Sequence, residues 1–253
     1  MHVAITGASQ GIGRALAEHY AAPGRRLTLL GRAVDRLEEV ARTCEAKGAM
    51  AGIVVADVTD ANAMAEALLS GDDLQPIDIL IANAGVGGRD ALAGRYGESP
   101  TKARLMADVN FRGVINTIDP LMPRFVTRRS GRIAIIGSLA GHVPLPSCPA
   151  YSASKAAART YGIALDRLVR REGVRVSVVS PGFVKTAMSA ELPMELPYLM
   201  SAERAAAIIV AGIAAGHREI VFPWQLRWAS RFLASLPEAL LLPILARSEP
   251  RLR

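Results

Sequence analysis

The stretch Thr6-Gly7-Ala8-Ser9-Gln10-Gly11-Ile12-Gly13 decides the fold, because it lies between the apolar run Val3–Ile5 and a helical pattern. Its three glycines permit a tight turn, the close approach of a pyrophosphate and close packing of a helix on a strand. The following helix directs its unpaired amide groups and positive dipole end toward the phosphates. The order of strand, glycine-rich turn and helix predicts a dinucleotide-binding unit, with Ser9, Gln10 and Ile12 among its contacts.

The rest of the chain repeats the alternation of short apolar runs with helical patterns. We expect strands at 3–5, 27–30, 53–55, 77–82, 132–136, 175–179 and 219–222, and helices at 13–20, 36–47, 61–69, 101–127, 151–172 and 202–215. Strands that are apolar on both faces and alternate with helices predict a parallel sheet covered on each side. The expected fold is α/β: a single-domain, Rossmann-type, doubly wound sheet of about seven strands over 1–222, with an amphipathic C-terminal extension over 223–253.

Composition narrows the function classes. The chain has 253 residues and a formal net charge of +7, which fits nucleic acid, an anionic membrane or an acidic ligand. Its arginines are scattered without interleaved aromatic residues, so we expect no nucleic-acid partner. Cys44 and Cys148 lack metal-ligand spacing and are interpreted as buried or half-buried thiols in a reducing compartment, with no metal. The sequence shows no secretory signal pattern and no apolar run of ~18 residues, which predicts a cytoplasmic protein.

The end of the second expected strand, Leu29-Leu30-Gly31-Arg32, indicates which dinucleotide is bound. NAD sites usually place a carboxylate there to hold the ribose 2′-hydroxyl. With Gly31 at that position no carboxylate repels a 2′-phosphate, and the Arg32 guanidinium can hold one with two hydrogen bonds. We therefore expect NADP(H) in preference to NAD(H). The alternative is that Arg32 is simply a solvated charge at a strand end.

A Tyr–Lys pair carries the expected chemistry. Tyr151 and Lys155 have helical i, i+4 spacing, which places both side chains on one face. A free phenol has a pKa of about 10, and a nearby ammonium favours the phenolate and lowers that pKa. Ser138, at the end of the fifth expected strand, can hydrogen-bond a substrate oxygen. Such a pair alone is common on helix surfaces, so its significance depends on the surrounding motifs.

Taken together, the motifs make the chain similar to the short-chain dehydrogenase/reductase family from residue 3 to about residue 216. The matching pieces, in order, are Thr6-Gly7-x-x-x-Gly11-x-Gly13, Asp57-Val58, Asn83-Ala84-Gly85, Asn110, Ser138, Tyr151-x-x-x-Lys155 and Pro181-Gly182.

The resemblance implies an enzyme with a catalytic tetrad. Tyr151 would be the general acid in carbonyl reduction and the general base in alcohol oxidation. Lys155 would bind the nicotinamide ribose and lower the pKa of Tyr151. Ser138 would orient the carbonyl, and Asn110 would hold a water that links Lys155 to solvent. The alternative is a catalytically silent NADP-binding or membrane-associated scaffold protein of the same fold.

The resemblance also implies the remaining cofactor contacts. Asp57 and Val58 would hold the adenine, and the ribose would lie beside Asn83, Ala84 and Gly85. Further contacts would come from Pro181, Gly182, the Val184 backbone and the Thr186 hydroxyl. We also expect a homodimer or homotetramer, formed through the helices at 101–127 and 151–172.

Substrate specificity should reside in the loop after Ser138 and in a lid over about 187–200. The lid contains three methionines, three leucines and one tyrosine, which favours a hydrophobic small-molecule substrate. These side chains could instead merely pack the lid down.

The extension carries Trp224, Trp228, Phe232 and Leu236 at four-residue intervals, which predicts one apolar helical stripe that ends before Pro237. Two interpretations remain open for this stripe. It packs on the core or on a second subunit, which is the commoner fate and the one we expect, or it makes peripheral contact with a membrane interface.

Overall fold

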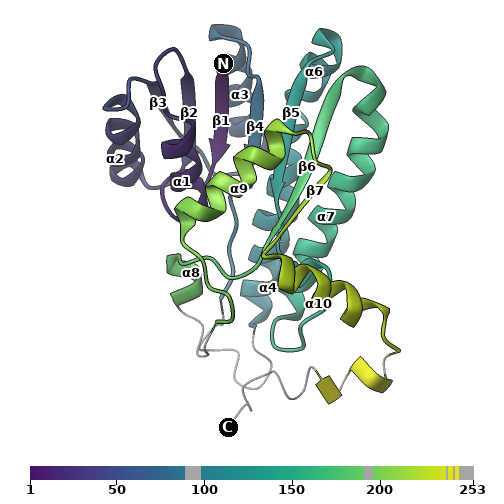
Figure 1. Cartoon of the computed structure of the whole chain (residues 1–253). Helices are drawn as coiled ribbons and strands as arrows, with labels where there is room; N and C mark the ends of the chain where they lie inside the picture. The colour runs from purple at the N-terminus through teal and green to yellow at the C-terminus, as the bar shows by residue number, and fades with distance from the viewer. Residues whose placement is uncertain (89–97, 191–195, 238, 242, 245–253) are drawn as a thin grey trace.

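The computed structural model describes residues 1–88, 98–190, 196–237, 239–241 and 243–244. Its centre is a parallel sheet of seven strands in the order β3-β2-β1-β4-β5-β6-β7 (Figure 1). The strands are β1 (His2–Thr6), β2 (Arg26–Gly31), β3 (Met50–Val55), β4 (Ile79–Ala82), β5 (Gly131–Ile136), β6 (Val174–Pro181) and β7 (Glu219–Phe222). This confirms the α/β, Rossmann-type sheet, and the boundary at residue 222 stays a prediction.

The chain starts in the middle of the sheet and builds outward in both directions. Ile5 of β1 is in register with Leu29 of β2 on one side and with Ile81 of β4 on the other. Strand order reverses between β1 and β4, and ligands of doubly wound sheets bind outside the carboxyl ends of the strands at such a point. The glycine-rich turn leaves β1 at that edge, so the topology places the expected site there.

Helices cover both faces of the sheet. The helices α1 (Gly11–Tyr20), α2 (Val34–Glu45) and α9 (Ala202–Ala214) enclose one hydrophobic cluster, which includes Leu16, Leu37 and Ile209. The other face carries α3 (Ala61–Leu74), α4 (Pro100–Ala107), α5 (Gly113–Ile118), α6 (Met122–Arg128) and α7 (Pro149–Val169), over a second cluster that includes Leu68 and Phe125. Two cores, one on each face, hold the sheet rigid beneath the site.

The prediction of one continuous helix over 101–127 is wrong, because the segment is divided into several helices. After α4 comes a π-helical turn, η2 (Asp108–Arg112), and then α5, which ends at Ile118 before Pro120. A new helix, α6, begins at Met122 with Pro123 in its first turn. The prolines end and restart the helix because proline lacks an N–H group and clashes with the preceding turn.

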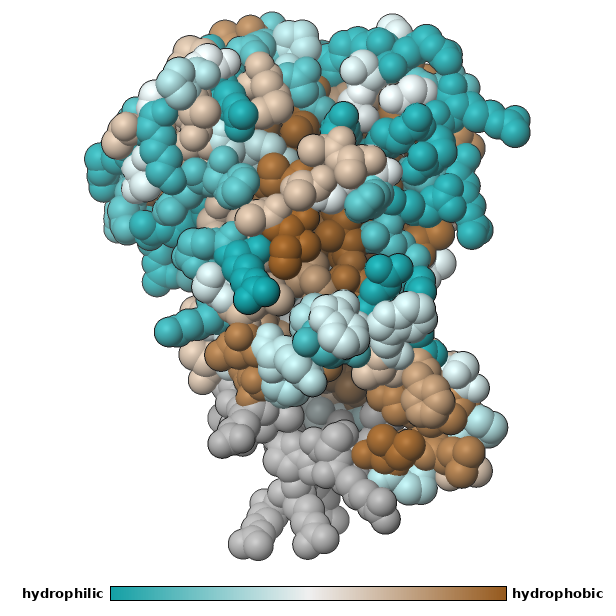
Figure 2. Space-filling model, in the orientation of Figure 1, coloured by the Kyte–Doolittle hydropathy of each residue, from teal (hydrophilic) through white to brown (hydrophobic). Residues whose placement is uncertain are grey.

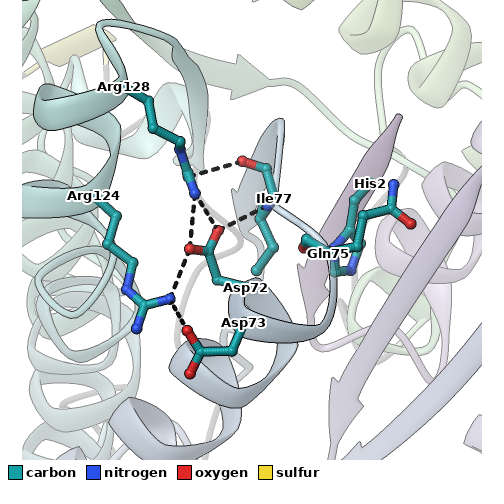
Figure 3. Close-up of polar contacts among 7 residues, drawn as sticks. All are labelled: His2, Asp72, Asp73, Gln75, Ile77, Arg124 and Arg128. Carbon is teal, nitrogen blue, oxygen red and sulfur yellow. Dashed lines mark hydrogen bonds and ion pairs between the residues drawn. The ribbon is translucent and has the colours of Figure 1, made fainter.

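Buried charges stabilise the sheet's amino-terminal edge, away from the site (Figure 3). Both oxygens of Asp72 accept hydrogen bonds from Arg128 Nη1 at 2.8 Å, and Oδ1 also accepts from the Ile77 N–H at 2.8 Å. Burial raises the pKa of Asp72, but these hydrogen bonds and that from Arg124 outweigh it and hold the pKa below its usual range. These ion pairs and hydrogen bonds hold α6 against the end of α3, so we assign the cluster a structural role.

The extension folds as α10 (Trp224–Ser235), which packs beside β7 and next to the short 3₁₀ helix η3 (Leu139–Gly141). Its stripe does not pack on the core, because Trp224, Trp228 and Phe232 are 68%, 60% and 63% exposed. The helix therefore packs on the folded domain through its other face, as expected, while the three aromatic side chains of the stripe do not. Contact of the stripe with a second subunit or with a membrane stays a prediction.

Candidate active site

The glycine-rich turn forms the floor of the site. Gly7 and Gly11 have φ angles of +64° and +56°, in the left-handed region that favours glycine. A Cβ at Gly13 would overlap the Gly7 carbonyl oxygen and the Asn83 side-chain amide. The turn is thus shaped as a cradle that admits no side chain at these points, which fits the close approach of a pyrophosphate.

Asn83, Ala84 and Gly85 continue that floor from the end of β4. The Asn83 amide Nδ2 donates to the carbonyl oxygens of Thr6 and Gly7 at 2.9 and 3.1 Å. The Thr6 hydroxyl oxygen accepts from the backbone N–H groups of Asn83 and Ala84. The segment is therefore pinned against the glycine-rich turn, and the Asn83 side chain holds the turn in shape.

Arg32 lies at the carboxyl end of β2, where its guanidinium is 3.4 Å from Asp57 Oδ2. The main cause of the lowered pKa of Asp57 is the hydrogen bond from the Thr59 backbone, and Arg32 contributes further lowering. Sequence reasoning missed Arg36, whose Nη1 donates to Gln10 Oε1 at 2.6 Å from the first turn of α2. Its place in the first turn of the helix that follows β2 was the available signal. Two guanidinium groups thus stand beside the cradle.

Val58 lies beneath this corner, with only 8% of its surface exposed. Its carbonyl oxygen accepts a hydrogen bond from Asn116 at 2.8 Å, and its side chain packs close to Gly113. The side chain belongs to the core on that face of the sheet, so any adenine contact falls to Asp57 and to the Val58 backbone.

Three members of the expected tetrad meet where β5 ends and α7 begins. Ser138 follows β5, and the Ser138 hydroxyl interacts with the Tyr151 phenol. The Lys155 ammonium lies 5.8 Å from the centre of the Tyr151 ring and donates to the Ile136 carbonyl oxygen at 3.0 Å. The spacing of four residues on α7 therefore does place both side chains on the inner face of the helix.

Burial dominates the electrostatics of this group. It raises the pKa of the Tyr151 phenol, and interaction with the Ser138 hydroxyl opposes part of that rise. Burial also lowers the pKa of Lys155 to about 8. Burial, Ser138 and Cys148 account for the shift of the Tyr151 pKa in this arrangement. The expected lowering of that pKa by the Lys155 ammonium therefore remains a prediction.

Asn110 is buried in η2 and clamps two segments of the site. Its Oδ1 accepts from the Val86 N–H at 2.8 Å, while Nδ2 donates to the Val86 carbonyl at 2.9 Å and to the Ser154 hydroxyl at 3.0 Å. A Cβ at Gly85 would lie 3.3 Å from both Asn110 Oδ1 and Lys155 Nζ, which places the asparagine beside the lysine. The expected water held by Asn110 remains a prediction, since both amide donors already have protein partners.

Glu98 is a second residue next to the candidate site that sequence reasoning missed. Its two carboxylate oxygens accept from the backbone N–H groups of Ala150 and Tyr151, at 2.6 and 3.0 Å. The N-cap residue of α7, Cys148, provides no side-chain cap to the helix. Glu98 takes over that function from a separate segment, and it thereby fixes the first turn of the helix that carries Tyr151.

The segment between β6 and the expected lid contacts both the lid and the cradle. Val184 forms an isolated β-bridge with Met200, and Thr186 lies against Gly11 of the cradle. Residues 191–195, which include the expected lid residues Leu192 and Met194, lie outside the described part of the chain.

Among the described lid residues, Met188 lies beside Gly87, which in turn lies beside Tyr151. It sits in the short helix α8 (Ala187–Ala190). A Cβ at Gly87 would meet Met188 Sδ at 2.9 Å and Tyr151 Cε2 at 3.2 Å, so both side chains border Gly87. Pro181 and Gly182 lie at the end of β6, where the Gly182 N–H donates to the Phe222 carbonyl at 2.7 Å.

Comparison with known proteins agrees with this geometry. Residues 1–197 match the family model for short chain dehydrogenases. A protein of Myxococcus xanthus, described as an uncharacterized oxidoreductase, is 36% identical over 237 residues, which cover 93% of this chain and 92% of that protein.

Two solved structures share the fold. A short-chain dehydrogenase from Sphingobium yanoikuyae in complex with NADPH has a TM-score of 0.79 at 25% identity, covering 94% of this chain and 97% of that one. A short chain dehydrogenase/reductase from Burkholderia phymatum in complex with NAD has a TM-score of 0.80 at 24% identity, covering 91% of each chain. The chain belongs to the short-chain dehydrogenase/reductase family, whose members are oxidoreductases that act on CH–OH groups.

Proposed function

We propose that this chain reduces the carbonyl group of a hydrophobic small molecule with NADPH, or oxidises the corresponding alcohol with NADP⁺. The observation that carries the proposal is the meeting of Ser138, Tyr151 and Lys155 beside the glycine cradle, at the carboxyl edge of the sheet. The bound nicotinamide supplies or accepts the hydride. Proton transfer and stabilisation of the substrate oxygen are assigned to side chains of this chain.

Tyr151 moves the proton. In the reducing direction its phenol O–H gives the proton to the substrate oxygen as the carbonyl becomes an alcohol, and in the oxidising direction the phenolate takes it back. The Ser138 hydroxyl donates to the same oxygen and steadies the charge that develops on it. The Lys155 ammonium, hydrogen-bonded to the Ile136 carbonyl oxygen and 5.8 Å from the centre of the Tyr151 ring, would favour the phenolate if it turned toward the phenol oxygen.

The catalytic assignment is tested by NADPH oxidation with a panel of ketones and aldehydes. Tyr151→Phe should lower kcat at least about 100-fold, because general acid–base catalysis contributes that much or more. Equal rates for the wild type and the variant would refute the role of Tyr151. Bound NADPH with no turnover of any member of the panel would favour the catalytically silent alternative.

The preference for NADPH rests on the second strand. Gly31 places no carboxylate near the expected 2′-phosphate, while Arg32 and Arg36 bring two guanidinium groups to that corner. The two solved relatives hold different cofactors, NADPH in one and NAD in the other, so the argument depends on these residues.

Arg32→Asp tests this preference directly. The variant should bind NADPH at least about tenfold more weakly, while NADH binding stays the same or improves, since the charge that attracts a phosphate has been reversed. Arg42→Asp is the matched control, because Arg42 is an exposed arginine on α2 with an ion pair to Glu38. A variant at Arg32 that kept its preference for NADPH over NADH would refute the assignment.

The substrate is proposed to be hydrophobic because Met188 and Tyr151 both border Gly87, and because Tyr198 and Leu199 of the lid are exposed at 55% and 47%. Within the carbonyl panel, long alkyl and aryl ketones should therefore show higher kcat/KM than phosphorylated ketones of similar size. The reverse order would contradict an apolar lid.

We also propose a homodimer or homotetramer that uses α4 and α7. Leu105 on α4 and Leu168 on α7 are 40% and 75% exposed, and α4 packs against α7. Leu168→Arg should lower the mass measured by sedimentation equilibrium, because a buried, unpaired guanidinium is costly at an interface. An unchanged mass would refute this face as the interface. A cytoplasmic location remains a prediction.

A further inference from the structure

The helix α10 is fixed by one face and displays an apolar stripe on the other. Its inner face is held by Ser230, which is buried, and by Leu226, whose side chain lies against Gly182. Trp224, Trp228 and Phe232 line the opposite side, and each is at least 60% exposed. The stripe is therefore anchored to the folded protein while its own side chains have little contact with it.

Positive charge surrounds the stripe. The twelve residues of α10 include two arginines and no aspartate or glutamate. The Arg231 guanidinium lies 5.6 Å from the centre of the Trp228 ring. Over 223–253 the sequence has five arginines and two glutamates, which gives a net charge of +3. The stripe therefore lies in a locally basic segment.

A hollow of about 250 Å³ opens beside the helix and adds to this charge. It is lined by Arg159, Arg227, Arg231 and Glu219, a balance of three cations and one anion. Glu219 is already paired with Arg159 at 2.7 Å. The positive charges of Arg227 and Arg231 are therefore not balanced by a carboxylate of the hollow. An anionic group is the complement that this surface lacks.

The stripe also lies at the end of the protein that carries the candidate active site. Figure 1 shows α10 and α8 at the same end, beyond the carboxyl ends of the strands. In Figure 2 hydrophobic side chains gather over α10 and the residues that follow it, at that same end of the molecule. Leu240 and Ile244, both exposed, extend the apolar character past α10.

We infer that α10 docks this protein onto the surface of a bilayer that contains anionic phospholipid. Tryptophan and phenylalanine would enter the boundary between headgroups and acyl chains, while Arg227 and Arg231 contact the lipid phosphates. The helix lies in the surface and does not cross it, since twelve residues span about 18 Å against a hydrocarbon thickness of about 30 Å. Among the described residues no helix is long and apolar enough to span a membrane.

Charge argues for lipid over a second copy of the chain as the occupant. A two-fold contact centred on the stripe would bring the arginines of one α10 near those of the other, with no acidic residue on either helix to compensate. An anionic lipid surface meets the stripe and the arginines together. The docked orientation also turns the lid toward the bilayer, where an apolar substrate would be concentrated.

The protein's own tryptophans report on this docking. The chain has two, Trp224 and Trp228, and both lie on the stripe. Adding vesicles of phosphatidylglycerol and phosphatidylcholine to the full chain should shift tryptophan emission to shorter wavelength and carry the protein into the vesicle pellet. Vesicles of phosphatidylcholine alone should do neither, and added salt should weaken binding to the mixed vesicles. The measurement uses no substrate or cofactor, so its result is independent of the proposed catalytic function.

Two variants separate the apolar and charged contributions. The triple variant Trp224→Ser, Trp228→Ser and Phe232→Ser should sediment with vesicles at least about tenfold more weakly, and Arg231→Glu should weaken binding to the anionic vesicles. Leu74→Ser is the matched apolar control, because Leu74 is 70% exposed on α3. Arg171→Glu is the matched charge control, on the exposed η4 (Arg170–Glu172).

Three results would overturn the inference. The first is a wild type that ignores the anionic vesicles, and the second is a triple variant that binds them as well as the wild type. The third is a triple variant that keeps vesicle binding but falls from a dimer to a monomer by sedimentation, which would assign the stripe to a subunit interface. Circular dichroism and urea unfolding of each variant verify that the fold is intact.

Discussion

Glu98 offers a sharp test of how α7 is positioned. Its carboxylate is buried, 9% exposed, and it accepts two backbone hydrogen bonds at the start of the helix. Hydrogen bonds to a charged group contribute about 1.5 kcal/mol each, so Glu98→Ala should lower the free energy of unfolding by about 3 kcal/mol. For a chain of this size that corresponds to a fall in Tm of roughly 6–12 °C. Glu98→Gln keeps one acceptor but not the charge, and it should cost about half as much.

Measurements of kcat should separate a loss of Tyr151 positioning from a general loss of stability. Because one of the two bonds holds the Tyr151 N–H, the Gln variant should lose roughly tenfold in kcat through misplacement of the phenol. The KM for NADPH should stay unchanged, since the glycine cradle is built on β1 and α1. Urea unfolding gives the stability, and initial rates at saturating NADPH give kcat, with the exposed Glu45→Gln on α2 as the control. A Glu98→Gln variant with wild-type stability and wild-type kcat would refute the reasoning.

Other sites give independent tests. Asp72→Asn leaves Arg128 without its buried counter-charge, and urea unfolding should show a loss of about 2 kcal/mol; no measurable loss would mean that solvent already screens the pair. Gly13→Ala places a Cβ against the Gly7 carbonyl, so NADPH titration should show weaker binding than for Gly52→Ala, where a Cβ meets no atom within 4 Å. Burial lowers the pKa of His142 to about 4. Between pH 6.5 and 4 the His142 ring is therefore protonated in the unfolded chain but neutral in the folded protein. Stability should therefore fall as the pH drops through that window, and His142→Gln should lose less stability across it; parallel curves for the two proteins would contradict a buried neutral ring.

The sheet could be predicted because its strands are buried on both faces. A continuous apolar run between two helical patterns, such as Ile133 to Ile136, indicates a buried strand of a parallel sheet. The strand β3 shows the limit of that signal. It lies at the edge of the sheet and starts three residues before Ile53, at Met50, which is 49% exposed. Gly52 interrupts the apolar run between Met50 and Ile53, so the sequence did not mark this start.

The active site divides in the same way. Tyr151 and Lys155 follow from helical spacing, and Ser138 follows from its place after a strand. Glu98 does not, because it is 52 residues from Ala150 in the sequence and its role exists only once the two segments meet. The exposure of the α10 stripe was equally beyond sequence reasoning, since an amphipathic pattern specifies that one face is apolar and says nothing about what covers it.

The wide turn at Asp108–Arg112 has a consequence for changes in chain length. A π-turn holds an extra residue, so the helical phase of α5 is offset by about 100° from the one that α4 alone would have set. With that offset α4 packs against α7 while α5 packs against α3. Deleting one residue here would restore a uniform α-helix, yet it would rotate one of those two contact faces away from its neighbour and turn Asn110 from its partners. The segment should therefore accept many substitutions on its outer surface but no insertion or deletion, and natural variation in its length is expected to be absent among relatives that keep the same site.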